Sequence, residues 1–209
     1  MRYLILFFLT LELTTSNAQE HYLLVGTYDS PKSEGIYVYK FNTETGTAKE
    51  VSHIKTPNPS FLAISPDEKF VYAVAETAPQ DGKGGDIAAF SFNKEKGTLT
   101  FINKQHSGGD HPCHVEVDKT GGWIFASNYT SGSLSVLPVN EDGGLGKAVS
   151  FQHYGSGPNV QRQKSPHVHG AIISPDNKTL FVTDLGIDKV MLYDFDATTG
   201  KLSPSKRPF

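Results

Sequence analysis

The chain has 209 residues, of which 37% are hydrophobic and 20% are charged, and its formal net charge is -3. This composition excludes a disordered or collagen-like chain, and its scattered basic residues offer no patch to a nucleic-acid partner. The single cysteine, Cys113, excludes an internal disulfide, so side-chain packing alone must hold the fold together.

Residues 1–18 have the pattern of a secretory signal peptide. The apolar run from Tyr3 to Leu13 carries only Glu12 as a charged residue, and Ser16-Asn17-Ala18 puts small residues where a signal peptidase cuts. A membrane anchor and a buried strand are the alternatives, but the run is too short to span a bilayer. We predict cleavage before Gln19, a periplasmic or secreted location, and no membrane span in the mature chain.

An internal repeat dominates the rest of the sequence. Three similar segments, residues 59–67, 112–120 and 168–176, open its three copies, and these segments start 53 and 56 residues apart. Each copy leads into further short apolar segments rich in Val, Ile, Phe and Tyr, and no window of helical length has a 3.6-residue stripe. The second segments are 70–76, 123–129 and 180–184, and the third are 86–92, 133–139 and 189–195. Four short strands per repeat are typical of a β-propeller blade.

The units follow one another in one predicted propeller domain, residues 19–209. We expect blade 1 at 22–54, blade 2 at 59–105, blade 3 at 112–153 and blade 4 at 168–206. Blade 1 has segments for its second, third and fourth strands but none for its first. Three complete blades and one three-stranded blade cannot close a ring, and an open propeller leaves apolar edges unpaired. We therefore expect the chain to be the N-terminal part of a larger protein.

Polar residues cluster where strands of the propeller are expected to start and end. The start of a first strand and the end of the neighbouring second strand meet at one mouth of the channel. This rule selects Ser60, Cys113, His114, His167, His169, Glu76, Asn128, Tyr129 and Asp184. His167 and His169 are two residues apart, which puts them on one face of a strand. Arg162 lies just upstream, in a loop long enough to suggest a functional role.

Several of these residues have a structural alternative. His114 either binds a ligand or bonds to adjacent backbone, because a buried polar group must be satisfied. Asp184 either contacts a ligand or caps a turn. The Ser-Pro-Asp segments at 65–67 and 174–176 are expected to be turns and nothing more. Cys113 has no assigned base and is more typical of a small buried hydrophobe than of a nucleophile.

The His-x-His spacing of His167 and His169 also invites a metal site. Asp184 or Asp110 would then be the third ligand, but the sequence does not fix the position of that ligand. We therefore predict no metal and no other cofactor.

Five motifs carry a family resemblance. They are Leu24-Val25-Gly26-Thr27-Tyr28, His111-Pro112-Cys113-His114-Val115, Ser127-Asn128-Tyr129-Thr130-Ser131-Gly132-Ser133, the loop from Gly155 to His169, and Thr183-Asp184-Leu185-Gly186-Ile187-Asp188-Lys189-Val190. Together they resemble the seven-bladed propeller lactonases, the family of the bacterial 6-phosphogluconolactonases and the fungal muconate-lactonizing enzyme. The resemblance implies an all-β seven-bladed β-propeller, of which this chain is an N-terminal fragment of about three and three-quarter blades.

The resemblance also implies a catalytic residue. In this family the histidine that opens the corresponding strand, in a His-Gly or His-Ser context, belongs to the active site, and His169-Gly170 stands at the matching place. Its partners in the family, an arginine and a glutamate, come from the next blade, which would lie beyond Phe209. We expect His169 to be catalytic, and we expect the substrate to be bound by Arg162, His114, His167 and Asp184.

The expected activity is hydrolysis of a sugar lactone to its aldonic acid. The substrate is either 6-phosphogluconolactone or an unphosphorylated aldonolactone, and export makes the second a serious alternative because phosphorylated sugar lactones belong to cytosolic metabolism. The complete protein is expected to be a monomer whose partner is this small molecule. The alternative is an exported, non-catalytic propeller that binds a ligand or a protein, because a fold alone does not fix function.

Overall fold

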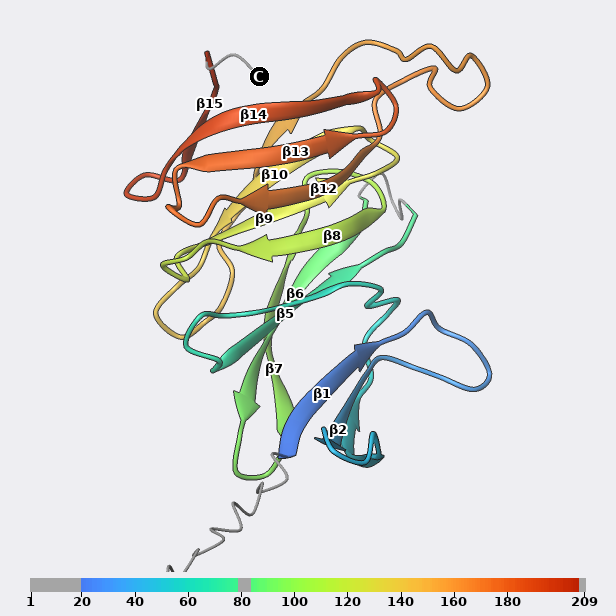
Figure 1. Ribbon diagram of the computed structural model, residues 1–209, viewed down its shortest axis with the longest axis vertical. Helices are drawn as coiled ribbons and strands as arrows, with labels where there is room; N and C mark the ends of the chain where they lie inside the picture. The colour runs from blue at the N-terminus through green and yellow to red at the C-terminus, as the bar shows by residue number, and fades with distance from the viewer. Residues whose placement is uncertain (1–19, 79–83, 207–209) are drawn as a thin grey trace, which may run out of the picture.

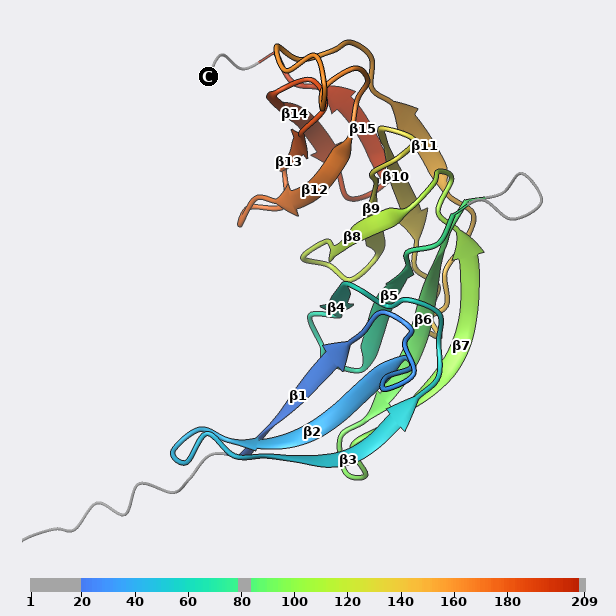
Figure 2. The same cartoon turned by 90° about the vertical axis from the view of Figure 1, so that its right-hand side faces the viewer.

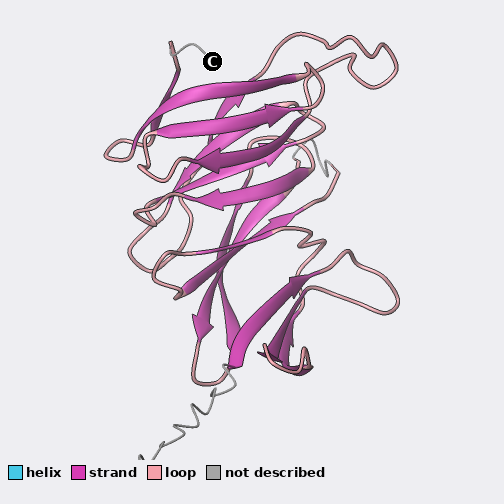
Figure 3. Ribbon diagram, in the orientation of Figure 1, coloured by secondary structure: helices cyan, strands magenta, loops and turns pink. Residues whose placement is uncertain are grey.

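The chain folds into four antiparallel sheets that follow one another along an arc (Figures 1 and 2). The structure is a computed structural model and describes residues 20–78 and 84–206. The predicted signal peptide lies outside these residues. Every regular element within them is a strand (Figure 3), and they contain no helix long and apolar enough to cross a membrane.

Each sheet is a meander whose strands follow the chain order, as the repeat predicts. The first sheet contains β1 (Glu20–Gly26), β2 (Ile36–Asn42) and β3 (Ala48–Ile54). The second contains β4 (Leu62–Ile64), β5 (Phe70–Ala75), β6 (Asp86–Asn93) and β7 (Thr98–His106). The third contains β8 (Pro112–Val117), β9 (Trp123–Asn128), β10 (Ser133–Pro138) and β11 (Val149–Gln152). The fourth contains β12 (Val168–Ile173), β13 (Thr179–Asp184), β14 (Lys189–Asp196) and β15 (Lys201–Pro204).

The first strand of each complete sheet lies on the inner side of the arc. Figure 2 shows β4, β8 and β12 on the concave side and β7 and β11 on the convex side. β8 contacts both β4 and β12, so the three inner strands form one continuous wall. This arrangement of blades around a common axis confirms the predicted all-β propeller fold, and it fixes which strand ends meet at the channel.

The hydrophobic core lies between the sheets, in three clusters. One joins the third and fourth sheets, one joins the second and third, and the smallest joins the first and second. Phe125, Ile124 and Tyr72 are among the largest fully buried side chains. Each such side chain stabilises the fold by about 1.5–3 kcal/mol relative to an exposed position. Because inner blades are covered on both faces, their central strands read as continuous apolar runs.

The Ser-Pro-Asp segments are turns, as predicted. The Ser65 hydroxyl accepts the N–H of Phe70 at 2.9 Å, and Ser174 accepts that of Thr179 at the same distance. In the repeat between them, a carboxylate oxygen of Asp118 accepts the equivalent bond from the first residue of β9 at 2.9 Å. These side chains close the turn between the first and second strands, at the end of the sheet opposite the mouth.

The fourth sheet has one apolar face that no other sheet in the described part of the chain covers. β13 alternates buried and exposed residues, whereas β9 is almost entirely buried. The exposed residues include Ile172, Phe181 and Val190, with 51%, 39% and 42% of their surface accessible. The other face of the same sheet packs on the third sheet through Leu180 and Val182. The uncovered face therefore has the apolar character of a surface that packs against a further blade.

Candidate active site

The residues predicted at the mouth of the channel lie at one edge of the sheets. Pro112 pairs with Asn128 across β8 and β9, and Val168 pairs with Asp184 across β12 and β13. The start of each inner strand therefore lies beside the end of its neighbour. Because the repeats are equivalent, successive blades contribute their polar residues to the same edge, which we call the mouth.

A β-bulge interrupts two of the inner strands at the second residue of each. The register of β8 on β9 shifts at Cys113, and that of β12 on β13 shifts at His169. A bulge leaves one residue unpaired, redirects its side chain and is frequent beside active sites. Cys113 and His169 are equivalent positions of the repeat, so the same backbone feature presents a thiol in one blade and an imidazole in the next.

His169 is the most accessible histidine of the group. Its exposed ring meets the ring of Tyr129 edge-on, with centroids 5.7 Å apart and planes at 86°. It also lines an open hollow of about 520 Å³ together with Thr183, Leu185, Lys189 and others. The imidazole makes no hydrogen bond to a described residue. Both ring nitrogens are therefore available to a ligand or a water molecule.

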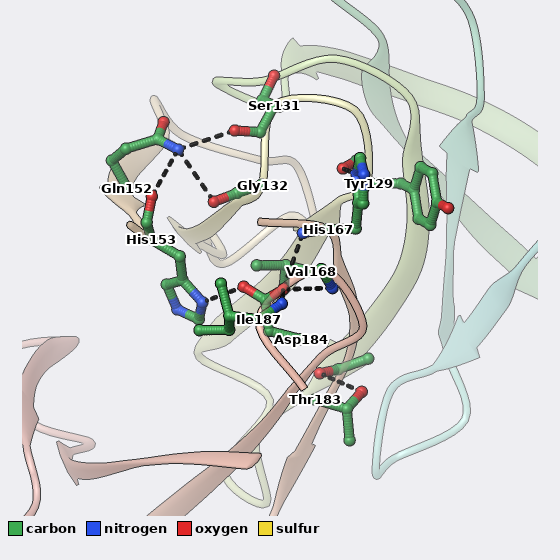
Figure 4. Close-up of polar contacts among 12 residues, drawn as sticks. Tyr129, Ser131, Gly132, Gln152, His153, His167, Val168, Thr183, Asp184 and Ile187 are labelled. Carbon is green, nitrogen blue, oxygen red and sulfur yellow. Dashed lines mark hydrogen bonds and ion pairs between the residues drawn. The ribbon is translucent and has the colours of Figure 1, made fainter. Parts of the chain in front are cut away.

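His167 is held in place by the neighbouring blade. Its ring stacks on that of Tyr129 at 4.6 Å and 13°, and Nδ1 donates to the Tyr129 carbonyl at 3.0 Å (Figure 4). The bond through Nδ1 leaves Nε2 as the ring's acceptor. His167 precedes β12, and the bulge at His169 follows it, so the expected two-residue alternation does not relate the two histidines. Both rings nevertheless contact Tyr129, which sequence reasoning had placed at the mouth.

His114 is a buried neutral histidine. Its ring packs against Phe61 with centroids 4.3 Å apart, and Nδ1 accepts the backbone N–H of Ala171 at 3.5 Å. Burial, reinforced by the nearby His169, lowers the pKa of His114 to about 4. These contacts favour the structural alternative, in which His114 bonds to adjacent backbone. Direct substrate binding by His114 stays a prediction.

Asp184 is a buried carboxylate that ties a turn to two blades. Oδ2 accepts from His153 Nδ1 at 2.7 Å, and Oδ1 accepts the backbone N–H groups of His167 and Gly186 at 2.8 and 2.9 Å (Figure 4). The side chain has no exposed surface. Burial alone would raise the pKa of Asp184, but these bonds outweigh it and hold the pKa below its ordinary value. The contacts favour turn capping over contact with a ligand.

His153 and Tyr193 complete this buried network, and sequence reasoning missed both. The Tyr193 hydroxyl bonds to His153 Nε2 at 2.9 Å, and both side chains are buried. His153 follows β11 and Tyr193 lies in β14, so only the packing of the third sheet on the fourth brings them together. No motif marks them, because their separation in sequence has no local meaning.

A second polar group surrounds Glu76 at the same mouth. Glu76 Oε2 accepts the hydroxyl of Tyr28 at 2.7 Å and that of Ser60. The bond to Glu76, together with burial, raises the pKa of Tyr28. Glu76 and Ser60 were selected from the sequence by the strand-end rule. Tyr28 belongs to the motif at residues 24–28 and was not predicted at the mouth.

Cys113 lies between this group and His169. Its Sγ is 3.8 Å from the carbonyl oxygen of Val168 and 3.7 Å from that of His169. Burial raises the pKa of the thiol to about 12, and the charge of Glu76 adds to the shift. The thiol is therefore protonated at neutral pH, which argues against a role as nucleophile.

Arg162 lies in the long loop between β11 and β12, which projects from the body of the molecule (Figure 1). The loop is closed by Gln163, whose side chain donates to the Leu185 carbonyl at 2.8 Å and accepts the N–H of Asn159 at 2.8 Å. The exposed guanidinium makes no hydrogen bond or ion pair with a described residue. The structure does not bring Arg162 into contact with His169, so its predicted role is untested.

Within residues 20–78 and 84–206, no three His, Cys, Asp or Glu side chains cluster as metal ligands would. Asp184, one of the two residues considered as a third ligand, is occupied by His153 and by backbone N–H groups.

The chain is similar in sequence and in fold to known lactonases. A family model described as "Lactonase, 7-bladed beta-propeller" matches residues 22–208. A 6-phosphogluconolactonase of Bacillus subtilis is 39% identical over 183 residues, which are 87% of this chain and 50% of that protein. One of Formosa agariphila is 40% identical over 169 residues, 79% of this chain and 47% of that protein. The chain thus spans about half the length of these curated relatives.

Solved structures give the same result. A Bacteroides fragilis protein, provisionally assigned as a 6-phosphogluconolactonase, superposes with a TM-score of 0.82 at 38% identity, over 91% of this chain and 54% of that one. The periplasmic gluconolactonase of Pseudomonas aeruginosa superposes with a TM-score of 0.79 at 33% identity, over 90% of this chain and 56% of that one.

Proposed function

This chain belongs to the seven-bladed β-propeller lactonase family, and we propose that it supplies part of an active site that hydrolyses a sugar lactone to its aldonic acid. The observation that carries the proposal is the accessible His169 imidazole, which lies at a β-bulge near the start of β12 and beside an open hollow that extends to Thr183 and Val190 on the uncovered face of the fourth sheet. Relatives named 6-phosphogluconolactonase and a periplasmic gluconolactonase of similar fold support it.

His169 acts as the general base in this proposal. An imidazole can take a proton from water as the water oxygen attacks the lactone carbonyl carbon. The carbon–oxygen bond of the ring then breaks, and the ring oxygen receives a proton, which gives the open aldonic acid. A guanidinium, that of Arg162 or of a residue outside the described part, stabilises the negative charge on the carbonyl oxygen.

The same proposal places the protein outside the cytoplasm. The pattern of residues 1–18 and the likeness to a periplasmic gluconolactonase support export, and export favours an unphosphorylated aldonolactone. N-terminal sequencing of the exported protein tests this part. A mature chain that begins near Gln19 agrees with it, whereas recovery of Met1 on a cytosolic protein contradicts it.

The activity is tested with the protein expressed from its complete coding sequence, using glucono-δ-lactone and 6-phosphogluconolactone and subtracting spontaneous ring opening. His169→Ala should lower kcat about 10²–10⁴-fold, the range that general acid–base catalysis supplies. His53→Ala is the matched control, because His53 is an exposed histidine on the outer strand β3. Full activity of His169→Ala with unchanged stability would place the catalytic centre elsewhere.

The second candidate, a non-catalytic binding propeller, makes a different prediction. In the presence of the unmodified protein, both lactones would then hydrolyse at the spontaneous rate, although the protein would still bind a sugar acid or a lactone.

A further inference from the structure

The group formed by Tyr28, Ser60 and Glu76 has the features of a ligand subsite. Glu76 is partly buried, and its Oε2 is held by the hydroxyls of Tyr28 and Ser60. Its Oε1 makes no hydrogen bond, and its carboxylate no ion pair, with any residue in the described ranges. A partly buried carboxylate with one oxygen fixed and the other open is a preorganised acceptor for hydroxyl groups.

Backbone contacts hold this carboxylate in position. Asn58 has a left-handed backbone with φ of 40°, and its carbonyl accepts the N–H groups of Ser60 and Glu76 at 2.8 and 3.1 Å. Its side-chain oxygen accepts the N–H of Asp29, next to Tyr28, at 2.9 Å. Asn58 therefore bonds to the backbone of Ser60, of Glu76 and of the residue that follows Tyr28, and so connects the two blades that contribute to the group. Asparagine adopts the left-handed region more readily than most other residues, which suits it to this position.

The group is continuous with the surroundings of His169. Ser60, Cys113 and His169 are equivalent positions of three successive repeats. Cys113 Sγ lies 3.7 Å from the His169 carbonyl oxygen, and the negative charge of Glu76 is near enough to raise the pKa of the Cys113 thiol. Cys113 therefore lies beside the backbone of the strand that carries His169 and close to the Glu76 group.

The chemistry of the group selects the class of ligand. Glu76 accepts hydrogen bonds from hydroxyls and repels phosphate or carboxylate groups. Tyr28, with 58% of its surface exposed, offers an aromatic face to the apolar side of a sugar ring. We propose that Glu76 and Tyr28 bind the hydroxyls of a neutral, unphosphorylated sugar lactone, an inference that rests on the proposed lactonase function and names its substrate class.

Two measurements on the protein from the complete coding sequence test the subsite. The first is calorimetric binding of 1,5-anhydro-D-glucitol, which has the ring and hydroxyls of the sugar but no lactone bond. We expect Glu76→Gln to weaken this binding about 10- to 100-fold, the loss expected for hydrogen bonds to a charged acceptor. The second is hydrolysis of glucono-δ-lactone, where KM should rise by a similar factor and kcat should change little, because the contact exists before and during the reaction.

Two further variants separate binding from folding. Glu95→Gln, at an exposed site in the turn between β6 and β7, makes the same chemical change away from the mouth and should leave both measurements unchanged. Tyr28→Phe keeps the ring, removes the hydroxyl that bonds to Glu76, and should weaken binding less than Glu76→Gln does. It stands in for Glu76→Gln if that variant fails to fold, as judged by urea unfolding.

The two ideas fail in different ways. If the unmodified protein hydrolyses no lactone, the proposed function fails, and binding of 1,5-anhydro-D-glucitol alone decides whether the subsite exists. If it hydrolyses glucono-δ-lactone and Glu76→Gln changes neither KM nor binding, or lowers only kcat, the subsite is overturned and the lactonase proposal stands.

Discussion

Removing the Asp184 carboxylate should be among the most damaging single changes in the described part of the chain. Asp184→Ala leaves His153 Nδ1 and the N–H groups of His167, Gly186 and Ile187 without their acceptor. A buried donor without a partner costs about 1–3 kcal/mol, and the breaking of a buried pair costs about 3–5 kcal/mol. Because these costs are not additive, we expect the free energy of unfolding to fall by about 3–5 kcal/mol.

Asp184→Asn should cost much less, about 1 kcal/mol. The amide oxygen can accept the backbone N–H groups, and the amide nitrogen can donate to His153 Nδ1 once the His153 proton moves to Nε2. Tyr193 tolerates that move, because its hydroxyl can accept as well as donate. The variant loses only the additional strength that hydrogen bonds gain when their acceptor is a charged carboxylate.

Urea unfolding of both variants measures the difference, with the midpoint shift converted at constant slope. Asp188→Asn is the control, since Asp188 is exposed and its left-handed backbone, with φ of 57°, accepts asparagine. The pKa of Asp184 lies below its ordinary value, so its contribution is complete above about pH 4 and is lost as pH falls through the folded pKa. The difference in the free energy of unfolding between the unmodified protein and Asp184→Asn should become smaller as the pH falls. If Asp184→Ala and Asp184→Asn lower the free energy of unfolding equally, the hydrogen-bond network proposed around Asp184 is refuted.

Two further predictions concern His114 and the uncovered face of the fourth sheet. Burial lowers the pKa of His114 to about 4. The free energy of unfolding should therefore fall by up to about 3 kcal/mol as pH drops from about 6.5 to 4. His114→Gln should remove that part of the pH dependence, as measured by urea unfolding. A parallel pH dependence in the variant would contradict this. Residues 19–209 expressed alone should associate with one another through the exposed Ile172 and Phe181 side chains. Replacing both residues with Ser should restore a monomer in size-exclusion chromatography. The control variant Val149→Ser, on β11, should not restore the monomer. A monomer at every concentration, with a sharp cooperative transition, would rule out the exposed face as the cause.

The strands could be predicted closely because their cause is local. A run such as Phe70 to Glu76 is apolar on both faces, and the strand observed there is Phe70–Ala75. The turn at Ser65 was also predictable, since the hydroxyl bonds within a few residues of its own position. The strand-end rule then brought His169, Tyr129 and Glu76 to one edge without any tertiary information.

What the sequence did not reveal depends on contacts between blades. His153 reaches Asp184 only because the third and fourth sheets pack face to face, and a spacing of 31 residues carries no local signal for that contact. The bulges at Cys113 and His169 were equally hidden, because alternation predicts a regular strand through both positions. The structural reading of His114 was one of two alternatives, and only its burial and its bond to Ala171 favour it.

The repeat itself separates the demands of the fold from those of function. At the turn of each blade the side chain must close the same hydrogen bond, and Ser65, Asp118 and Ser174 all do so with an oxygen acceptor. At the start of each inner strand the equivalent residues are Ser60, Cys113 and His169, which share no chemistry. A position that the fold required to be polar, acidic or apolar would look alike in every blade. Cys113 and His169 lie at bulges, where the ladder of strand pairing passes over one residue, so the fold does not require one residue type there and each blade can present a different group at the mouth.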